Sequence, residues 1–143
     1  MTARISRRFR VSAPPEAVWD FIADPAQRAA AISVVDRFES TDEGYRWHVR
    51  LPIPFIDRTI AVETQDVVID PPEHVEFIGR SPAFSVRGVH DVEPIDGAQT
   101  ALDTEFIVDG RLPGVERFFR ENLDAELQHL AAALQARVTQ PDR

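Results

Sequence analysis

Apolar and polar residues alternate in seven segments of the chain, and this two-residue period predicts strands. The first runs from Ile5 to Val11. Six more are expected later, at Val34–Thr41, Tyr45–Leu51, Arg58–Ile69, Val75–Arg80, Phe84–Val92 and Thr100–Val108. Short turn signals rich in Asp, Gly and Pro separate most of them, so neighbouring strands are expected to pair antiparallel.

Three segments change to a helical period. Two short helices are expected directly after the first strand, at Pro14–Ala23 and Pro25–Ile32, where Pro and acidic residues suit a first turn. A long helix is predicted from Val115 to Arg137, with an apolar stripe at a spacing of three and four. The stripe contains Val115, Phe118, Phe119, Leu123, Leu127, Leu130, Leu134 and Val138. Glu126 is among the charged residues expected on the opposite, solvent-facing side.

This order of elements predicts an α+β fold in one domain, residues 1–143, with a strongly twisted antiparallel sheet of about seven strands. The long helix spans roughly 35 Å at 1.5 Å per residue and buries its stripe against the sheet. A straight helix and a curved sheet do not meet along their whole length. The gap either fills with side chains or remains as a ligand cavity, typically of about 300–1,000 Å³.

Three motifs resemble the START-like helix-grip superfamily (SRPBCC), which includes birch-pollen-allergen-like proteins. Val11–Pro25 resembles its opening strand followed by "A-P-x-E-x-V-W" and "D-P". Asp70–Phe77 resembles its "P-P-x-x-hydrophobic" hairpin, and Glu93–Thr100 resembles its "L-x-P-x-G-x-T" turn, with Val92 in place of Leu.

The resemblance implies a helix-grip fold, a sheet wrapped on the C-terminal helix, with a cavity for a hydrophobic small molecule such as a lipid, isoprenoid, quinone or polyketide-like compound. Fold alone does not assign function. Two alternatives therefore stay open: a polyketide cyclase or aromatase, and a protein-interaction module similar to chaperone activators. Binding or transport without catalysis is the favoured interpretation.

Composition narrows the classes of partner. The net charge is −8, and all 16 basic residues are Arg, which makes general nucleic-acid binding unfavourable. A cluster at Arg4, Arg7, Arg8 and Arg10 is either an anion-binding patch or a solvated strand face. The chain has no Cys, no apolar run of membrane-spanning length and no apolar segment behind its first charges. We therefore expect a cytoplasmic monomer or homodimer without integral membrane association.

His90 is the strongest candidate for chemistry. The alternation places it on the same inward face as Val86, Gly88 and Val92. There a neutral imidazole either hydrogen-bonds a ligand carbonyl, acts as a general base, or is a satisfied core histidine. Arg7 is also expected inward, in a structural salt bridge, at the rim or against the ligand.

The predicted ligand-binding set combines inward positions of the sheet with the helix stripe and one loop residue. It contains Trp47, Val49, Phe55, Thr64, Val86, His90, Thr104, Phe106, Phe119, Leu123 and Leu127. No catalytic residue is assigned unless His90 acts as one. No cofactor is expected, and the four histidines lack metal-ligand spacing, so no metal is expected either.

The segment Pro52–Ile56 carries three large apolar residues between two strands. It is interpreted as a lid over the cavity mouth, a dimer contact or a membrane-touching tip. The alternative is that it packs against the edge of its own sheet.

Overall fold

The computed structural model of the chain describes residues 2–54 and 57–139, and the elements follow the predicted order. The strands are β1 (Thr2–Val11), β2 (Val35–Ser40), β3 (Tyr45–Val49), β4 (Ile60–Asp70), β5 (His74–Arg80), β6 (Phe84–Pro94) and β7 (Thr100–Gly110). The helices are α1 (Pro15–Ile22), α2 (Pro25–Ala31) and α3 (Val115–Thr139). None of the helices in this part of the chain is apolar enough over a sufficient length to span a membrane.

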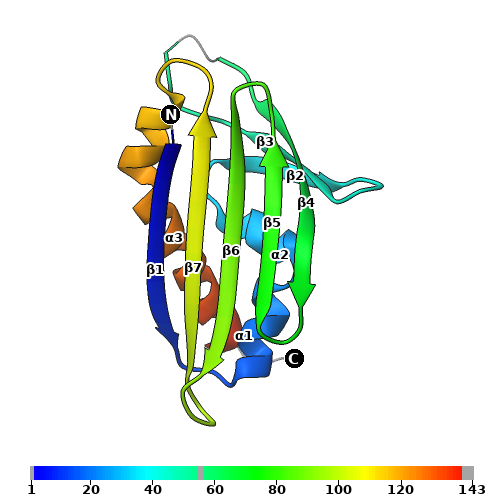
Figure 1. Ribbon diagram of the computed structural model, residues 1–143, viewed down its shortest axis with the longest axis vertical. Helices are drawn as coiled ribbons and strands as arrows, with labels where there is room; N and C mark the ends of the chain where they lie inside the picture. Colours follow the sequence, from blue (N-terminus) through cyan, green and yellow to red (C-terminus); the bar gives the residue numbers. More distant parts are fainter. Residues whose placement is uncertain (1, 55–56, 140–143) are drawn as a thin grey trace.

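All seven strands form one antiparallel sheet in the order β1-β7-β6-β5-β4-β3-β2. Strands β2 to β7 follow one another as neighbours, whereas β1 returns to pair with β7 from Thr2↔Asp109 to Val11↔Thr100. Figure 1 shows the three helices on one side of this sheet, with β2 and β3 turned away from the direction of β1 and β7. Register shifts in β2 and β4 accompany this curvature. The structure therefore has the helix-grip α+β architecture.

The two short helices begin where the local chemistry predicts. Pro15 and Pro25 occupy first-turn positions, where a missing N–H costs no helical hydrogen bond. The Asp24 side chain accepts a hydrogen bond from the backbone N–H of Ala26 at 2.9 Å and caps α2. Figure 1 shows α1 near the end of the sheet where β1 finishes, and α2 behind the sheet on the side of β4 and β5.

The expected parity of the strands is confirmed. In β6, Val86, His90 and Val92 are buried, and in β7 Leu102, Thr104, Phe106 and Val108 are buried. The intervening Asp91, Asp103 and Glu105 are not buried and lie on the outer face. One side of the sheet thus faces the helices and the other faces solvent.

Two charged residues, Glu126 and Arg7, bear on the expected faces of the long helix and the first strand. Glu126 was expected on the solvent-facing side of the long helix, but it is only 4 % exposed. The prediction was wrong because position 126 is three residues after Leu123 and four before Leu130, which places it on the apolar stripe. Arg7 is exposed on the edge strand β1, and its Nε lies 2.8 Å from Asp124 Oδ1 on α3, so of the three alternatives the structure has the salt bridge.

Candidate functional site

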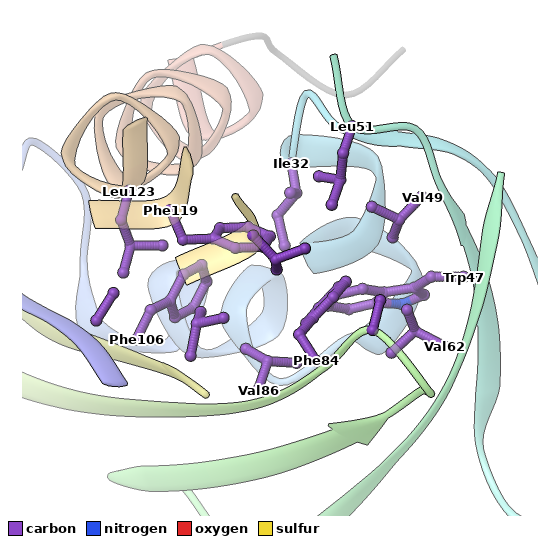
Figure 2. Packing of buried hydrophobic residues seen from close by; sticks show 14 of the residues in the cluster. Ile32, Trp47, Val49, Leu51, Val62, Phe84, Val86, Phe106, Phe119 and Leu123 are labelled. Atoms are coloured by element: carbon purple, nitrogen blue, oxygen red, sulfur yellow. The ribbon is translucent and has the colours of Figure 1, made fainter. Parts of the chain in front are cut away.

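A void of about 30 Å³ lies between the sheet and α3. Its lining comes from β3, β5, β6, β7, α3 and the segment that follows α2. The lining residues are Ile32, Val34, Trp47, Val49, Phe77, Phe84, Val86, Phe106, Val108, Phe119, Leu123 and Glu126. Figure 2 shows many of these side chains converging from the sheet, α2 and α3.

The void is much smaller than the cavity that the shape argument predicts. Space of this size holds two or three water molecules at most, at about 10–15 Å³ each. Aromatic side chains fill most of the gap: Phe84 and Phe119 have ring centres 5.0 Å apart, and Trp47 and Phe77 are 5.4 Å apart. In this conformation the sheet and helix are therefore nearly closed upon each other.

The structure divides the predicted ligand-binding residues into three groups. Those that line the void are Trp47, Val49, Val86, Phe106, Phe119 and Leu123. Those that are buried without lining it are Thr64, His90, Thr104 and Leu127. Phe55 lies outside the described residues. In the same loop, Ile53 is half-buried and packs against the core.

His90 is fully buried and pairs with Thr104, its direct cross-strand neighbour. His90 Nδ1 and Thr104 Oγ1 are 2.6 Å apart. Burial, with a smaller contribution from the positive charge of Arg28, lowers the pKa of His90 to about 3. The imidazole is therefore neutral at pH 7 and a weak base. It is poorly suited to act as a general base, since an efficient one has a pKa near the working pH.

Arg28 is a buried charge that the sequence analysis did not select. It is 3 % exposed, and its guanidinium donates from Nη1 to the backbone oxygen of Ile22 at 2.8 Å and from Nη2 to Asp66 on β4. Its Cζ atom lies 5.2 Å from the ring centre of Phe77. The one available signal was its position as the single charged residue in the alanine-rich segment 25–31.

Among the described residues that line the void, Glu126 is the only charged one, and its carboxylate accepts hydrogen bonds from Ser33. Oε1 and Oε2 accept hydrogen bonds from the Ser33 backbone N–H at 3.0 and 3.1 Å, and the Ser33 hydroxyl donates to the same carboxylate. His129 Nδ1 lies 3.5 Å from Oε2. These contacts attach the segment between α2 and β2 to the middle of α3.

That segment separates the void from a hollow on the protein surface. The hollow has a volume of about 390 Å³ and is open to solvent; its lining includes Ser33, Val34, Leu51 and Pro52. Val34 lines both spaces. The partition between solvent and the interior void is therefore thin at Val34, and the Ser33–Glu126 hydrogen bonds hold it in place.

Comparison with known proteins agrees with this architecture. The sequence profile of the family described as "Polyketide cyclase / dehydrase and lipid transport" matches residues 2–135. A search of curated proteins finds no match.

Solved structures share the fold at low sequence identity. A conserved protein from Geobacillus kaustophilus is 17% identical with a TM-score of 0.76, over 96% of this chain and 95% of that chain. A START superfamily protein from Mycobacterium smegmatis is 18% identical with a TM-score of 0.72, over 94% of this chain and 96% of that chain. An aromatase/cyclase from Streptomyces sp. R1128 is 18% identical with a TM-score of 0.68, over 96% of this chain and 92% of that chain.

Proposed function

Because the chain belongs to the polyketide cyclase / dehydrase and lipid transport family, we propose that it binds an apolar small molecule between its sheet and α3. The observation that carries this proposal is the void, whose lining is apolar except for Glu126. Burial in such a site contributes about 25 cal/mol per Å² of apolar ligand surface, before the cost of association. The class of ligand is a lipid, isoprenoid, quinone or polyketide-like compound.

A ligand of this class requires the closed void to expand. The sheet side resists expansion because β6 and β7 are paired along their whole length, from Phe84↔Gly110 to Pro94↔Thr100. The segment 32–34 belongs to no strand; it is attached to α3 through Ser33 and Glu126, and to the end of β3 by one hydrogen bond from Arg50 N–H to the Val34 oxygen at 2.8 Å. Outward movement of this segment joins the void to the surface hollow at Val34, which gives the ligand a route from solvent.

Binding is favoured over catalysis by the state of His90. The cyclase or aromatase alternative needs a group that transfers a proton, and a fully buried imidazole with a pKa of about 3 transfers one poorly at neutral pH. A His90→Ala variant that turns over a poly-ketone as fast as the wild type argues against the enzymatic alternative.

The experiment is a titration of the purified protein with 2-methylnaphthalene and with geraniol, one flat and one chain-like apolar probe. A ligand at concentration L that binds only the folded state stabilises it by RT ln(1 + L/Kd), so the melting temperature rises with the logarithm of the ligand concentration once that exceeds Kd. We expect such a rise for at least one probe. No rise with either probe overturns the proposal.

Substitutions at two leucines of α3 test where the probe binds. Leu123→Ala enlarges the void, whereas Leu134→Ala removes an equally buried side chain that does not line it. Each substitution costs about 2–5 kcal/mol of stability. Only Leu123→Ala is expected to increase probe affinity, and an equal change in both variants contradicts the proposed location.

A further inference from the structure

Two side-chain nitrogen atoms in the interior of the described chain have no hydrogen-bond partner: Arg28 Nε and His90 Nε2. Both residues are at least nine-tenths buried. Buried polar groups are nearly always paired, because an unpaired one keeps the cost of its desolvation. An exception at two neighbouring residues indicates a site that receives a partner from outside the chain.

Both nitrogens are donors. Arg28 Nε carries a hydrogen in every state of the guanidinium. For His90, donation from the Thr104 hydroxyl to Nδ1 leaves only Nε2–H unpaired. The opposite tautomer leaves two groups unpaired, the Thr104 hydroxyl hydrogen and the Nε2 lone pair. The first arrangement is therefore the more stable one, and it places the hydrogen on Nε2.

Phe77 is in contact with both donor residues and with the void. Its side chain lines the void. The Arg28 guanidinium is 5.2 Å from its ring centre, and the His90 ring stacks almost parallel to it, at 6.2 Å and 16°. The ring sits directly against Gly88, where an added Cβ would be 2.1 Å from Phe77 Cε1. Both donor residues therefore lie one side chain away from the void.

We infer that Arg28 Nε–H and His90 Nε2–H together form the polar end of the ligand site, behind Phe77, and that they bind an acceptor oxygen on an apolar ring ligand. This inference rests on the proposed function and names its ligand more closely: a carbonyl-bearing ring compound. Asp66 pairs with Nη2 of the same guanidinium and holds the group in place.

The electrostatics of this site favour an acceptor over a donor. Arg28 supplies a positive charge in a region of low dielectric constant, where a hydrogen bond to a charged donor is stronger than a neutral one. A neutral His90 adds a second N–H without adding a second charge. A carbonyl oxygen can accept a hydrogen bond from either group, whereas a hydrocarbon of the same shape leaves both unpaired.

The test compares menadione with 2-methylnaphthalene, which has the same carbon skeleton without the two carbonyl groups. Because the carbonyls favour water, an apolar site without donors binds the hydrocarbon more tightly. We expect the opposite order, with menadione bound about tenfold more tightly by the wild-type protein. In ¹⁵N–¹H spectra, the Arg28 Nε–H and His90 Nε2–H resonances are expected to shift with menadione and not with the hydrocarbon.

Two variants separate the inference from the proposed function, because each is expected to change menadione affinity and hydrocarbon affinity differently. His90→Leu is expected to reduce menadione affinity about tenfold more than hydrocarbon affinity, whereas a purely structural role lowers both equally. Phe77→Leu replaces the aromatic ring beside the two donors with a smaller side chain, and is expected to increase the preference for menadione. Hydrocarbon binding that equals or exceeds menadione binding, with unmoved resonances, overturns the inference and leaves the proposed function standing. If neither menadione nor 2-methylnaphthalene binds, the inference is overturned, and the proposed function is overturned with it only when geraniol also fails to bind.

Discussion

Thr104 Oγ1 and His90 Nδ1 form a 2.6 Å hydrogen bond between directly opposed residues of β7 and β6, on the buried face of the sheet. The pair is enclosed by Phe77 and Phe106, whose ring centres lie 6.2 and 5.9 Å from the imidazole centre. The bond therefore fixes both the orientation of the buried His90 ring and the nitrogen that carries its hydrogen.

The first prediction concerns the coupling between these two residues. Thr104→Val leaves His90 Nδ1 without a donor in the core and is expected to cost about 1–3 kcal/mol in the free energy of unfolding. His90→Leu alone leaves the Thr104 hydroxyl unpaired. Urea unfolding of both single variants and of the double variant measures the coupling, which should exceed about 0.5 kcal/mol. Additive losses contradict a net contribution from this bond.

The second prediction concerns stability in acid. Since the folded pKa of His90 is about 3, against 6.5 for the unfolded chain, the unfolded state binds a proton first as the pH falls. The stability that the neutral imidazole contributes is complete above pH 6.5 and declines below it, by about 1.4 kcal/mol per pH unit. The unfolding free energy of wild type minus that of His90→Leu should therefore fall by roughly 2–3 kcal/mol between pH 7 and 4.5. A constant difference over this range contradicts the low pKa.

The third prediction concerns His74, on the outer face, and has the opposite sign. The Asp91 carboxylate at 2.5 Å from Nδ1, followed by Glu76 at 2.7 Å from Nε2, raises the pKa of His74 above its ordinary value. Its stabilisation is present below pH 6.5 and is lost as the pH rises through the raised value.

Because Asp91 is half exposed, the contribution is expected to be small, about 0.5–1 kcal/mol. His74→Gln should remove it, so the stability difference from wild type is larger at pH 6 than at pH 9. Asp91→Asn, which removes the largest cause, should reduce the same difference. Identical profiles for all three proteins would show that the pair does not stabilise the fold.

Much of the fold follows from patterns that are local in the chain. Alternation placed Trp47 and Val86 on the inner face, and the sequence Asp24-Pro25 marked the start of α2, because each depends on neighbours within a few residues. The antiparallel order also follows from short turns, apart from the return of β1 to β7.

The site was less predictable because distant segments decide it. Arg28 is buried since Asp66, 38 positions later, supplies its counter-charge. Ser33 similarly satisfies Glu126 across 93 positions. The size of the void depends on how closely Phe84 and Phe119 approach each other, which periodicity does not encode.

The fourth prediction concerns the Arg28–Asp66 pair. Asp66→Asn leaves a guanidinium in the core without its counter-charge, and removal of one partner of a buried pair costs about 3–5 kcal/mol. Glu121→Gln is the matched control, because Glu121 pairs with Arg117 on the exposed face of α3, where solvent screens the pair. This substitution is expected to leave the free energy of unfolding nearly unchanged. Urea unfolding at pH 7 measures both losses. Equal losses would mean that the buried pair contributes no more than a surface one.

The last prediction uses two glycines to test how tightly Phe77 is held. An alanine Cβ at Gly88 would overlap the Phe77 ring, whereas at Gly97, in the exposed turn between β6 and β7, it meets nothing within 4 Å. Gly88→Ala must therefore displace a ring that packs against Trp47 and His90, and overpacking of this kind costs about 1–3 kcal/mol. Gly97→Ala should change the free energy of unfolding by less than about 0.5 kcal/mol. If both variants unfold at the same urea concentration as the wild type, the Phe77 ring moves freely, and the void has more room than its volume indicates.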